Sequence, residues 1–393
     1  MAAELTLTEA ARSLSVSPAT LRRWVADGIV PLSDGQWTPA ALAQARIVAR
    51  LRQRGHNLDQ LRRAAKEGRL AYGYLEDLFP GAGNGAQRDL AAAAAETGLE
   101  PELIRRIWST AGFPASALDQ LSEDDIDLLR CLGAVLDAGL PLVAFLQLVR
   151  VYGQALAQIS DAEVKLFHLF VHEPMIRDGA PVLEIAEELS DLASELLPLS
   201  GPIMEGFHQR LLKHFLEQDV VGHLELVADD AALGRMRVAI AFADLAGYTR
   251  LTEEVGEEEA LGVVERFVEL VGETLPDDAR VVKTIGDEVM VVGTDASALA
   301  DWAVGFQELA TERPLPRIGL HSGSVLYRDG DYYGRAVNLA ARVGARATGG
   351  EVLVTREVKA AAGKYLAFQA IGEVKLKGFD EATELFLARP AEK

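Results

Sequence analysis

The chain has 393 residues, 49% of them hydrophobic, and a formal net charge of −20 at pH 7. This length allows two or more domains with sizeable cores, and the charge argues against a protein that coats nucleic acid or anionic membranes. The single cysteine, Cys131, excludes an intrachain disulfide and, with no signal-peptide pattern at the start, suits a cytoplasmic protein. The most apolar stretch, 131–149, is interrupted by Asp137 and Pro141, so it predicts buried helices and no membrane span.

Residues 1–80 have the pattern of a small helical domain. Residues 7–24 predict a helix, a short turn and a second helix, and the segment resembles the MerR-type winged-helix domain. In that resemblance Arg22 and Arg23 would lie on a DNA-recognition helix. Residues 1–80 hold 11 Lys and Arg against 8 Asp and Glu, a net charge of only +3. DNA is therefore a possible but disfavoured partner, and a role in packing and regulation is preferred.

A second copy of the same pattern follows in the chain. Residues 7–31 align without a gap on residues 90–114, at an offset of 83, and the alignment continues at an offset of 84. The stretch 81–85, Gly-Ala-Gly-Asn-Gly, predicts a flexible joint between the copies. The second copy has exchanged basic for acidic surface, so we expect a degenerate MerR-like copy that does not read DNA. It opens a helical regulatory domain predicted for residues 86–230.

Residues 161–230 predict further helices, which Pro198 and Gly201-Pro202 are expected to break. Five of the seven histidines lie in this region. His168 and His172 are four residues apart and could form a metal pair, although ordinary packing or surface histidines are the preferred interpretation. The predicted N-terminal region is thus all-α: a winged-helix-like domain and a helical bundle.

From residue 231 to residue 393 the pattern changes to alternating strands and helices. The βαββαβ order predicts an α+β, ferredoxin-like sheet with helices on one side, built from a strand at 237–243, a helix at about 251–271, a hairpin at 280–294, a helix at 297–310 and a strand at 316–321. Charged residues lie at the strand ends. Asp244 follows the first strand, and Lys283 and Asp287 are held on either side of the hairpin turn.

Four motifs in this region, FADLAGYT, KTIGDE, RIGLHSG and DYYGRAVNLAAR, resemble the catalytic domain of class III nucleotidyl cyclases. The resemblance covers about residues 235–389. It implies that Asp244 and Asp287 bind two metal ions, Mg²⁺ or Mn²⁺. It also implies that Lys283 and Asp331 select adenine.

The same resemblance assigns the remaining positions of the site. Asn338 would orient the ribose, and Arg342 would stabilise the transition state. Lys375 resembles the lysine that holds the triphosphate, with Lys377 the less favoured candidate. Arg317 matches an arginine that lies near the phosphates in some members of the family.

The family's active sites lie between two catalytic domains, so the resemblance implies a homodimer. One chain would supply the metal-binding aspartates, and its partner would supply the residues for the base, the ribose and the transition state. Seven residues separate Gly323 from Asp331, where many members carry a longer dimerisation arm. The chain is therefore closer to the short-arm bacterial subgroup.

These residue types fit the chemistry of an adenylate cyclase, in which ATP becomes 3′,5′-cyclic AMP and pyrophosphate. Two carboxylates can hold two divalent cations, and phosphoryl transfer depends on positioning and electrostatics. A lysine can donate to adenine N1 while an aspartate accepts from the N6 amino group. The alternatives are a guanylate cyclase, or a DNA-binding regulator whose cyclase-like domain only senses nucleotide. Regulation by the N-terminal region is expected, and the resemblance suggests inhibition and a response to pH.

Overall fold

The computed structural model describes residues 6–14, 16–32, 35–37, 39–53, 55–66, 87–177, 182–225 and 235–391. The joint predicted at 81–85 and the domain boundaries predicted near residues 80 and 230 lie outside these residues. The chain separates into two compact units, Met1–Gln209 and Arg210–Lys393, and each is described by itself.

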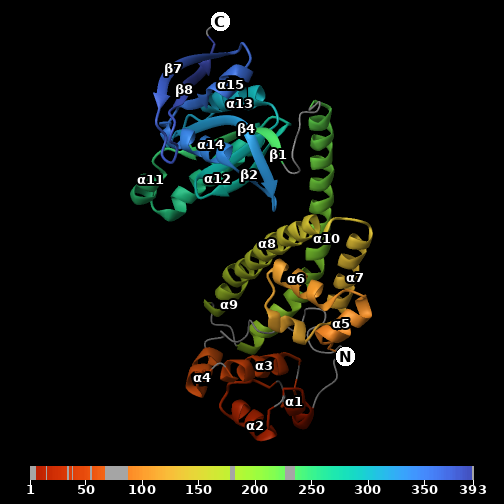
Figure 1. Cartoon of the computed structure of the whole chain (residues 1–393). Coiled ribbons are helices and arrows are strands. Elements are labelled where there is room, and N and C mark those ends of the chain that lie inside the picture. Colours follow the sequence, from red (N-terminus) through yellow and green to blue (C-terminus); the bar gives the residue numbers. More distant parts are fainter. Residues whose placement is uncertain are drawn as a thin grey trace. The chain divides into compact units, whose positions relative to one another are not determined.

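The first group of helices contains α1 (Leu7–Ser13), α2 (Pro18–Ala26), α3 (Pro39–Gln53) and α4 (Leu58–Lys66) (Figure 1). Helix α2 begins after Ser17, whose hydroxyl caps the first turn. It buries Leu21 and Trp24, while Arg22 and Arg23 are exposed. The predicted pair of helices is therefore present, and the winged-helix assignment stays a prediction.

A second group repeats these elements in order: α5 (Leu90–Thr97), α6 (Pro101–Ala111), the short helix η2 (Ala115–Asp119), α7 (Glu123–Asp137) and α8 (Leu142–Phe167). Helices α5 and α6 begin 83 residues after α1 and α2 (7 to 90, 18 to 101), and α7 and α8 begin 84 residues after α3 and α4 (39 to 123, 58 to 142). Buried positions follow the same offsets, as in Leu21 with Ile104 and Leu61 with Phe145. The sequence repeat thus coincides with a repeat of helices and of core positions.

Two long helical runs complete the N-terminal region. Helix α8 continues through the π-helical turn η3 (His168–His172) into α9 (Glu173–Arg177), and α10 spans Val182–Glu225. The prediction that Pro198 and Gly201-Pro202 break this region is wrong, because Pro198 and Pro202 both lie inside α10. Each proline removes a single backbone donor, and the hydrogen bonds of the neighbouring turns maintain a helix of 44 residues.

One helical run in the described part of the chain, Leu142–Arg177, is long and apolar enough to cross a membrane by length and composition. Its most apolar window is 17% buried. The prediction of buried helices at 131–149 is therefore met only in part: α8 buries Phe145, Leu146 and Val149 near its start and exposes most of its later apolar residues. That no membrane is a partner stays a prediction.

The second unit contains an eight-stranded sheet in the order β2-β3-β1-β4-β6-β8-β7, with β5 paired to β4. Its strands are β1 (Arg235–Leu245), β2 (Ala279–Ile285), β3 (Glu288–Gly293), β4 (Pro316–Arg328), β5 (Asp331–Tyr333), β6 (Val352–Thr355), β7 (Leu366–Val374) and β8 (Thr383–Pro390). The unit begins within α10, at Arg210. Its further helices are α11 (Tyr248–Val255), α12 (Glu257–Thr274), α13 (Ala296–Leu309), α14 (Arg335–Arg346) and α15 (Arg356–Ala361). The predicted βαββαβ order is present. The helix expected at 251–271 is divided, because Gly256, at φ 91°, ends α11 and precedes α12.

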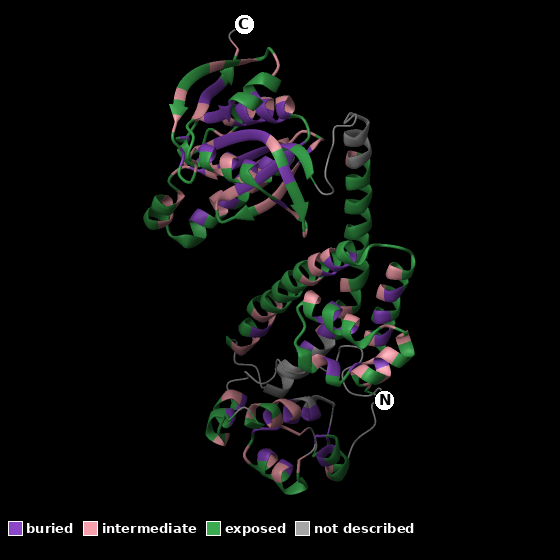
Figure 2. Ribbon diagram, viewed as in Figure 1, coloured by how far each residue is buried: buried purple, intermediate pink, exposed green. Residues whose placement is uncertain are grey.

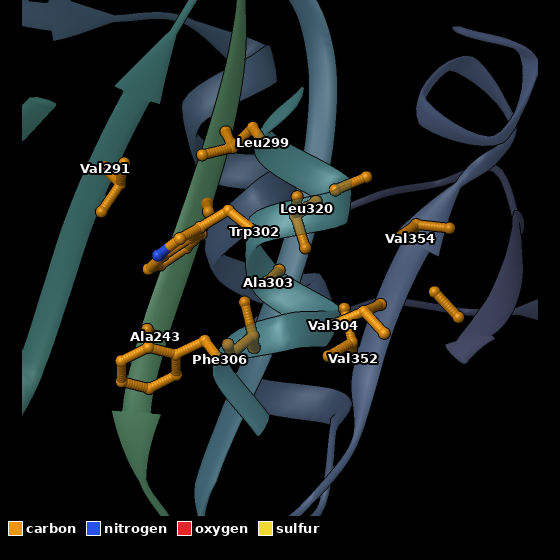
Figure 3. Close-up of a cluster of buried hydrophobic side chains, with 14 of the residues drawn as sticks. Ala243, Val291, Leu299, Trp302, Ala303, Val304, Phe306, Leu320, Val352 and Val354 are labelled. Carbon is orange, nitrogen blue, oxygen red and sulfur yellow. The ribbon is translucent and has the colours of Figure 1, made fainter. Parts of the chain in front are cut away.

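Helices cover both faces of this sheet, whereas the sequence predicted helices on one side. Buried residues, in purple, lie in the sheet and in the helices that cover it (Figure 2). Alternate residues of β1 face two different cores. Ala239, Ala241 and Ala243 pack with α12 and α13, and Trp302 and Phe306 of α13 lie over this side (Figure 3). Residues Val238, Ile240 and Phe242 pack with α14 on the other side. Residues 238–243 are buried throughout, which is the pattern of a strand covered on both faces.

Candidate active site

Strand register brings charged side chains together at one end of β3, β1 and β4. Asp244 of β1 pairs with Glu288 of β3 and with Arg317 of β4. Asp287 lies in the turn just before Glu288. The two aspartates that the sequence predicts as metal ligands are therefore close together, with Arg317 beside them. We call Asp244, Asp287 and Arg317 the metal group.

Electrostatics in the metal group favour an added cation. Burial, and then the hydrogen bond to Asp244 and the charge of that residue, raise the pKa of Asp287 to about 6. Burial, and then the charge of Asp244, also raise the pKa of Glu288. Arg317 offsets part of this negative charge, since its Nε donates to Asp244 Oδ2 at 2.7 Å and its Nη2 forms an ion pair with the same oxygen.

The donor chemistry of the metal group fits Mg²⁺ or Mn²⁺, which prefer carboxylate oxygens. A divalent cation would relieve the repulsion that raises the pKa of Asp287. The described residues contain no cluster of three or more possible ligands. The protein would therefore supply two carboxylates, and the other ligand oxygens would come from substrate and water.

Lys283 and Asp331 form a second group, which we call the base group. Lys283 Nζ donates to Asp331 Oδ2, and the two side chains are 37% and 25% exposed, so a ligand can reach them. A register shift in β2 sets the direction of Lys283. The shift pairs Lys283 with Met290, which belongs to the core under α14, and so turns Lys283 to the α14 face of the sheet.

Helix α14 presents Asn338 and Arg342 on its exposed side. Its other side lies so close to β4 that a Cβ on Gly319 would be 1.9 Å from the backbone nitrogen of Gly344. Within the described part of the chain, the side chains of Asn338 and Arg342 form no hydrogen bond or ion pair. Both are therefore available to a ligand or to a second chain.

Lys375 and Lys377 follow β7, on either side of the buried Leu376. Both lysines are exposed, so the structure does not favour one over the other for the triphosphate. Among the described residues, no hydrogen bond or ion pair joins either lysine to the metal group or to the base group. Nor does any such bond connect these two groups to each other.

The sequence reasoning missed three residues next to the predicted site. Glu288 is the last residue of the KTIGDE motif and pairs with Asp244, so its place in the motif was an available signal. Arg280 and Tyr332 hydrogen-bond to each other beside the base group. They are 52 residues apart, and nothing in the local pattern indicates that they meet.

Comparisons with known proteins find matches in two regions of the chain. Residues 234–389 match the adenylate and guanylate cyclase catalytic domain, and residues 26–216 match the adenylate cyclase regulatory domain. A pH-sensitive adenylate cyclase of Mycobacterium tuberculosis is 30% identical over 304 residues, which are 74% of this chain and 75% of that protein. An adenylate cyclase of Streptomyces coelicolor is 33% identical over 273 residues, 67% of this chain and 68% of that protein. The adenylyl cyclase CyaB from P. aeruginosa superposes with a TM-score of 0.36 and 20% identity, over 40% of this chain and 96% of that one.

Proposed function

Because this chain belongs to the class III adenylate and guanylate cyclase family, we propose that it converts ATP into 3′,5′-cyclic AMP and pyrophosphate. The observation that carries the choice of adenine is the contact between Lys283 and Asp331. A cation that donates to N1 beside a carboxylate that accepts from the N6 amino group matches adenine, and guanine presents the reverse pattern. The relatives named adenylate cyclases support the same choice.

The other residues divide the work of phosphoryl transfer. Asp244 and Asp287 would hold two Mg²⁺ or Mn²⁺ ions, which supply charge neutralisation on the attacking and leaving oxygens when bound. Asn338 would orient the ribose so that its 3′-hydroxyl can approach the α-phosphate. Arg342 would stabilise the charge that develops in the transition state.

The triphosphate would be held by basic side chains. Lys375 or Lys377 would bind it from the loop after β7. Arg317 forms an ion pair with Asp244. A metal ion bound by Asp244 would compete with this ion pair, and the guanidinium of Arg317 could then contact the phosphates. The site needs no histidine or serine nucleophile, because the ribose hydroxyl is the attacking group.

The site would be shared between two chains of a homodimer. Supporting this, no hydrogen bond or ion pair among the described residues joins the metal group to the base group. The side chains of Asn338 and Arg342 are also exposed and form no hydrogen bond or ion pair among the described residues. A residue that contacts a partner across a dimer interface must be accessible in this way. The metal group of one chain would then meet the base group and α14 of its partner.

The N-terminal helices, residues 1–80 and 86–230 in the predicted division, would regulate this activity. His168 Nδ1 and His172 Nδ1 lie 3.1 Å apart, so one ring must donate while the other accepts. Protonation of both rings removes the acceptor and places two cations side by side. Because His172 is only 1% exposed, this change would act inside the helical packing at the π-helical turn, where Glu173 lies 3.7 Å from His168 Nε2.

The test is an assay of the purified full chain with ATP and with GTP, each with Mg²⁺ and with Mn²⁺. We expect cyclic AMP from ATP and much less cyclic GMP from GTP. Preferential cyclic GMP production would support the guanylate cyclase alternative. Nucleotide binding without any turnover, under every metal and pH condition, would reject the enzyme and support a nucleotide-sensing regulator.

A further inference from the structure

Arg280 and Tyr332 link β2 to β5 directly beside the base group. Arg280 Nη2 donates to the Tyr332 hydroxyl at 2.8 Å, and its guanidinium carbon lies 5.7 Å from the centroid of the Tyr332 ring. Tyr332 is only 6% exposed. A buried hydroxyl without a partner is costly, so this bond constrains where the two strands lie.

The two residues are neighbours of the base group in both strands. Asp331 directly precedes Tyr332, and the Tyr332 backbone N–H donates to Asp331 Oδ1 at 2.8 Å. Lys283 lies three residues after Arg280 in β2, beyond the register shift. The bond from Arg280 to Tyr332 and the bond from Lys283 to Asp331 therefore span the same gap.

No backbone ladder crosses that gap. Strand β2 pairs with β3, and β5 pairs with β4. The sheet connects β2 and β5 only through the ladders of β3, β1 and β4, and side chains of the described residues join the two strands directly. The contact of Lys283 with Asp331 is partly exposed, and exposed ion pairs fix geometry poorly. Tyr332, by contrast, is held in the core with Val325 and Ala336, and its ring lies 5.2 Å from that of Tyr327.

We propose that Arg280 and Tyr332 are positioning residues that fix the spacing of Lys283 and Asp331, and thereby set the preference for adenine over guanine. The proposal rests on the proposed function. Base recognition requires a donor and an acceptor at fixed separation, and small displacements weaken both bonds. Loss of the Arg280 to Tyr332 bond would weaken the link from β2 to β5, while β5 stays paired with β4 and α14, which carries Asn338 and Arg342, keeps its support from β4.

The test is the variant Tyr332→Phe, which keeps the ring and removes the hydroxyl. We expect the ratio of kcat/KM for ATP to that for GTP to fall about tenfold, mostly through a higher KM for ATP with kcat little changed. Arg280→Met should have a similar effect. The double variant should be no worse than Arg280→Met, which loses the same bond and also the contact of its guanidinium carbon with the Phe215 ring, 5.1 Å from the centroid. Tyr327→Phe is the matched control, since Tyr327 contacts Tyr332 through its ring, and it should retain the wild-type ratio.

Thermal unfolding of each variant separates positioning from simple stability. A lower melting temperature with an unchanged ATP-to-GTP ratio would overturn the proposal, and so would a fall in kcat with an unchanged KM for both nucleotides. Binding of fluorescent ATP and GTP analogues by the full chain gives a second readout. A shifted affinity ratio in Tyr332→Phe would support the positioning role even if the wild-type chain proved inactive, which would reject the proposed function alone.

Discussion

Asp287 shows how strand register sets the chemistry of one side chain. The tight turn at Gly286, with φ 63°, places the carboxyl beside Asp244, and burial with that neighbour raises its pKa to about 6. The folded chain therefore holds this proton more tightly than the unfolded chain, whose aspartate has the ordinary pKa of 3.8. The contribution of Asp287 to stability is complete below pH 3.8 and is lost as the pH rises through about 6.

We predict that Asp287→Asn stabilises the metal-free chain at pH 8, because it removes a charge that the fold disfavours. The expected gain is on the order of 1 kcal/mol, since the side chain is partly exposed and solvent screens the charge. At about pH 3.5, below the unfolded pKa of 3.8, the carboxyl is mostly protonated in both states, so the gain should be small. Urea unfolding in EDTA at the two pH values measures this difference. Mn²⁺ should stabilise the wild type at pH 8 more than the variant. An equal gain at both pH values would contradict the argument.

The contact between α14 and β4 decides where a whole element of the site lies. Gly319 and Gly344 let helix and strand approach closely, and nothing larger fits between them. We predict that Gly319→Ala destabilises the chain by about 3 kcal/mol or more, as expected for overpacking against backbone. Chemical denaturation followed by circular dichroism measures the loss.

Gly305→Ala provides the matched control for this prediction. Gly305 lies in α13, and a Cβ added there has no heavy atom within 4 Å. Gly305→Ala should raise the free energy of unfolding of the chain by about 0.5–1 kcal/mol, because alanine is the better helix former. If Gly319→Ala were as stable as Gly305→Ala, the close packing of α14 would not be a constraint.

At the scale of elements, the sequence predicted what local patterns determine. The alternating strands, the hairpin with Gly286 and the repeated helices in the N-terminal region follow from hydrophobic pattern and turn residues. The sequence-based prediction failed where packing between distant parts of the chain determines the structure. The prolines of α10 were expected to end a helix that continues, and the second covered face of β1 was overlooked, although residues 238–243 are apolar without a break.

The candidate site divides in the same way. The order of the motifs predicted that Asp244, Asp287, Lys283 and Asp331 are site residues. The structure brings them together as two pairs, Asp244 with Asp287 and Lys283 with Asp331. A register shift in β2 turns Lys283 to the α14 face. The sequence of β2 does not predict this shift, because irregular pairing also depends on the partner strand. For the same reason, the bond between Arg280 and Tyr332 could not be anticipated.

For the molecule as a whole, the shared site predicts complementation. An Asp244→Ala chain would lack a proposed metal ligand, and an Arg342→Ala chain would lack the arginine proposed to stabilise the transition state. In a mixed dimer both defects fall in one site and leave the other intact. Mixing the two inactive variants under conditions of subunit exchange should therefore restore activity, up to about one wild-type site per heterodimer. Continued inactivity, with heterodimers demonstrated by differential tagging, would argue against a shared site.

A second prediction at this scale concerns pH. If protonation at His168 and His172 changes the regulatory region, the activity of the full chain should change between about pH 8 and about pH 5.5. The fragment 231–393 should lose this component and keep only the pH dependence of catalysis itself. Activity profiles of the two proteins over this range make the comparison.

The variant His172→Gln tests the same claim within the full chain. It should flatten the profile toward that of the fragment, whereas the exposed His208→Gln should not. Identical profiles and specific activities for the fragment and the full chain would remove the regulatory role, and would favour DNA binding by the exposed Arg22 and Arg23 instead.

The close contact of Gly319 with Gly344 also restricts how any regulator can act. Because α14 packs directly against the backbone of β4, we expect Arg342 to move together with the sheet that carries Asp244. In the proposed homodimer, a regulatory signal would then rotate one catalytic domain against the other, and two-fold symmetry would transmit that rotation equally to both sites. Inhibition would consequently be concerted: a population of dimers would divide into fully active and fully silent molecules, with few half-active ones.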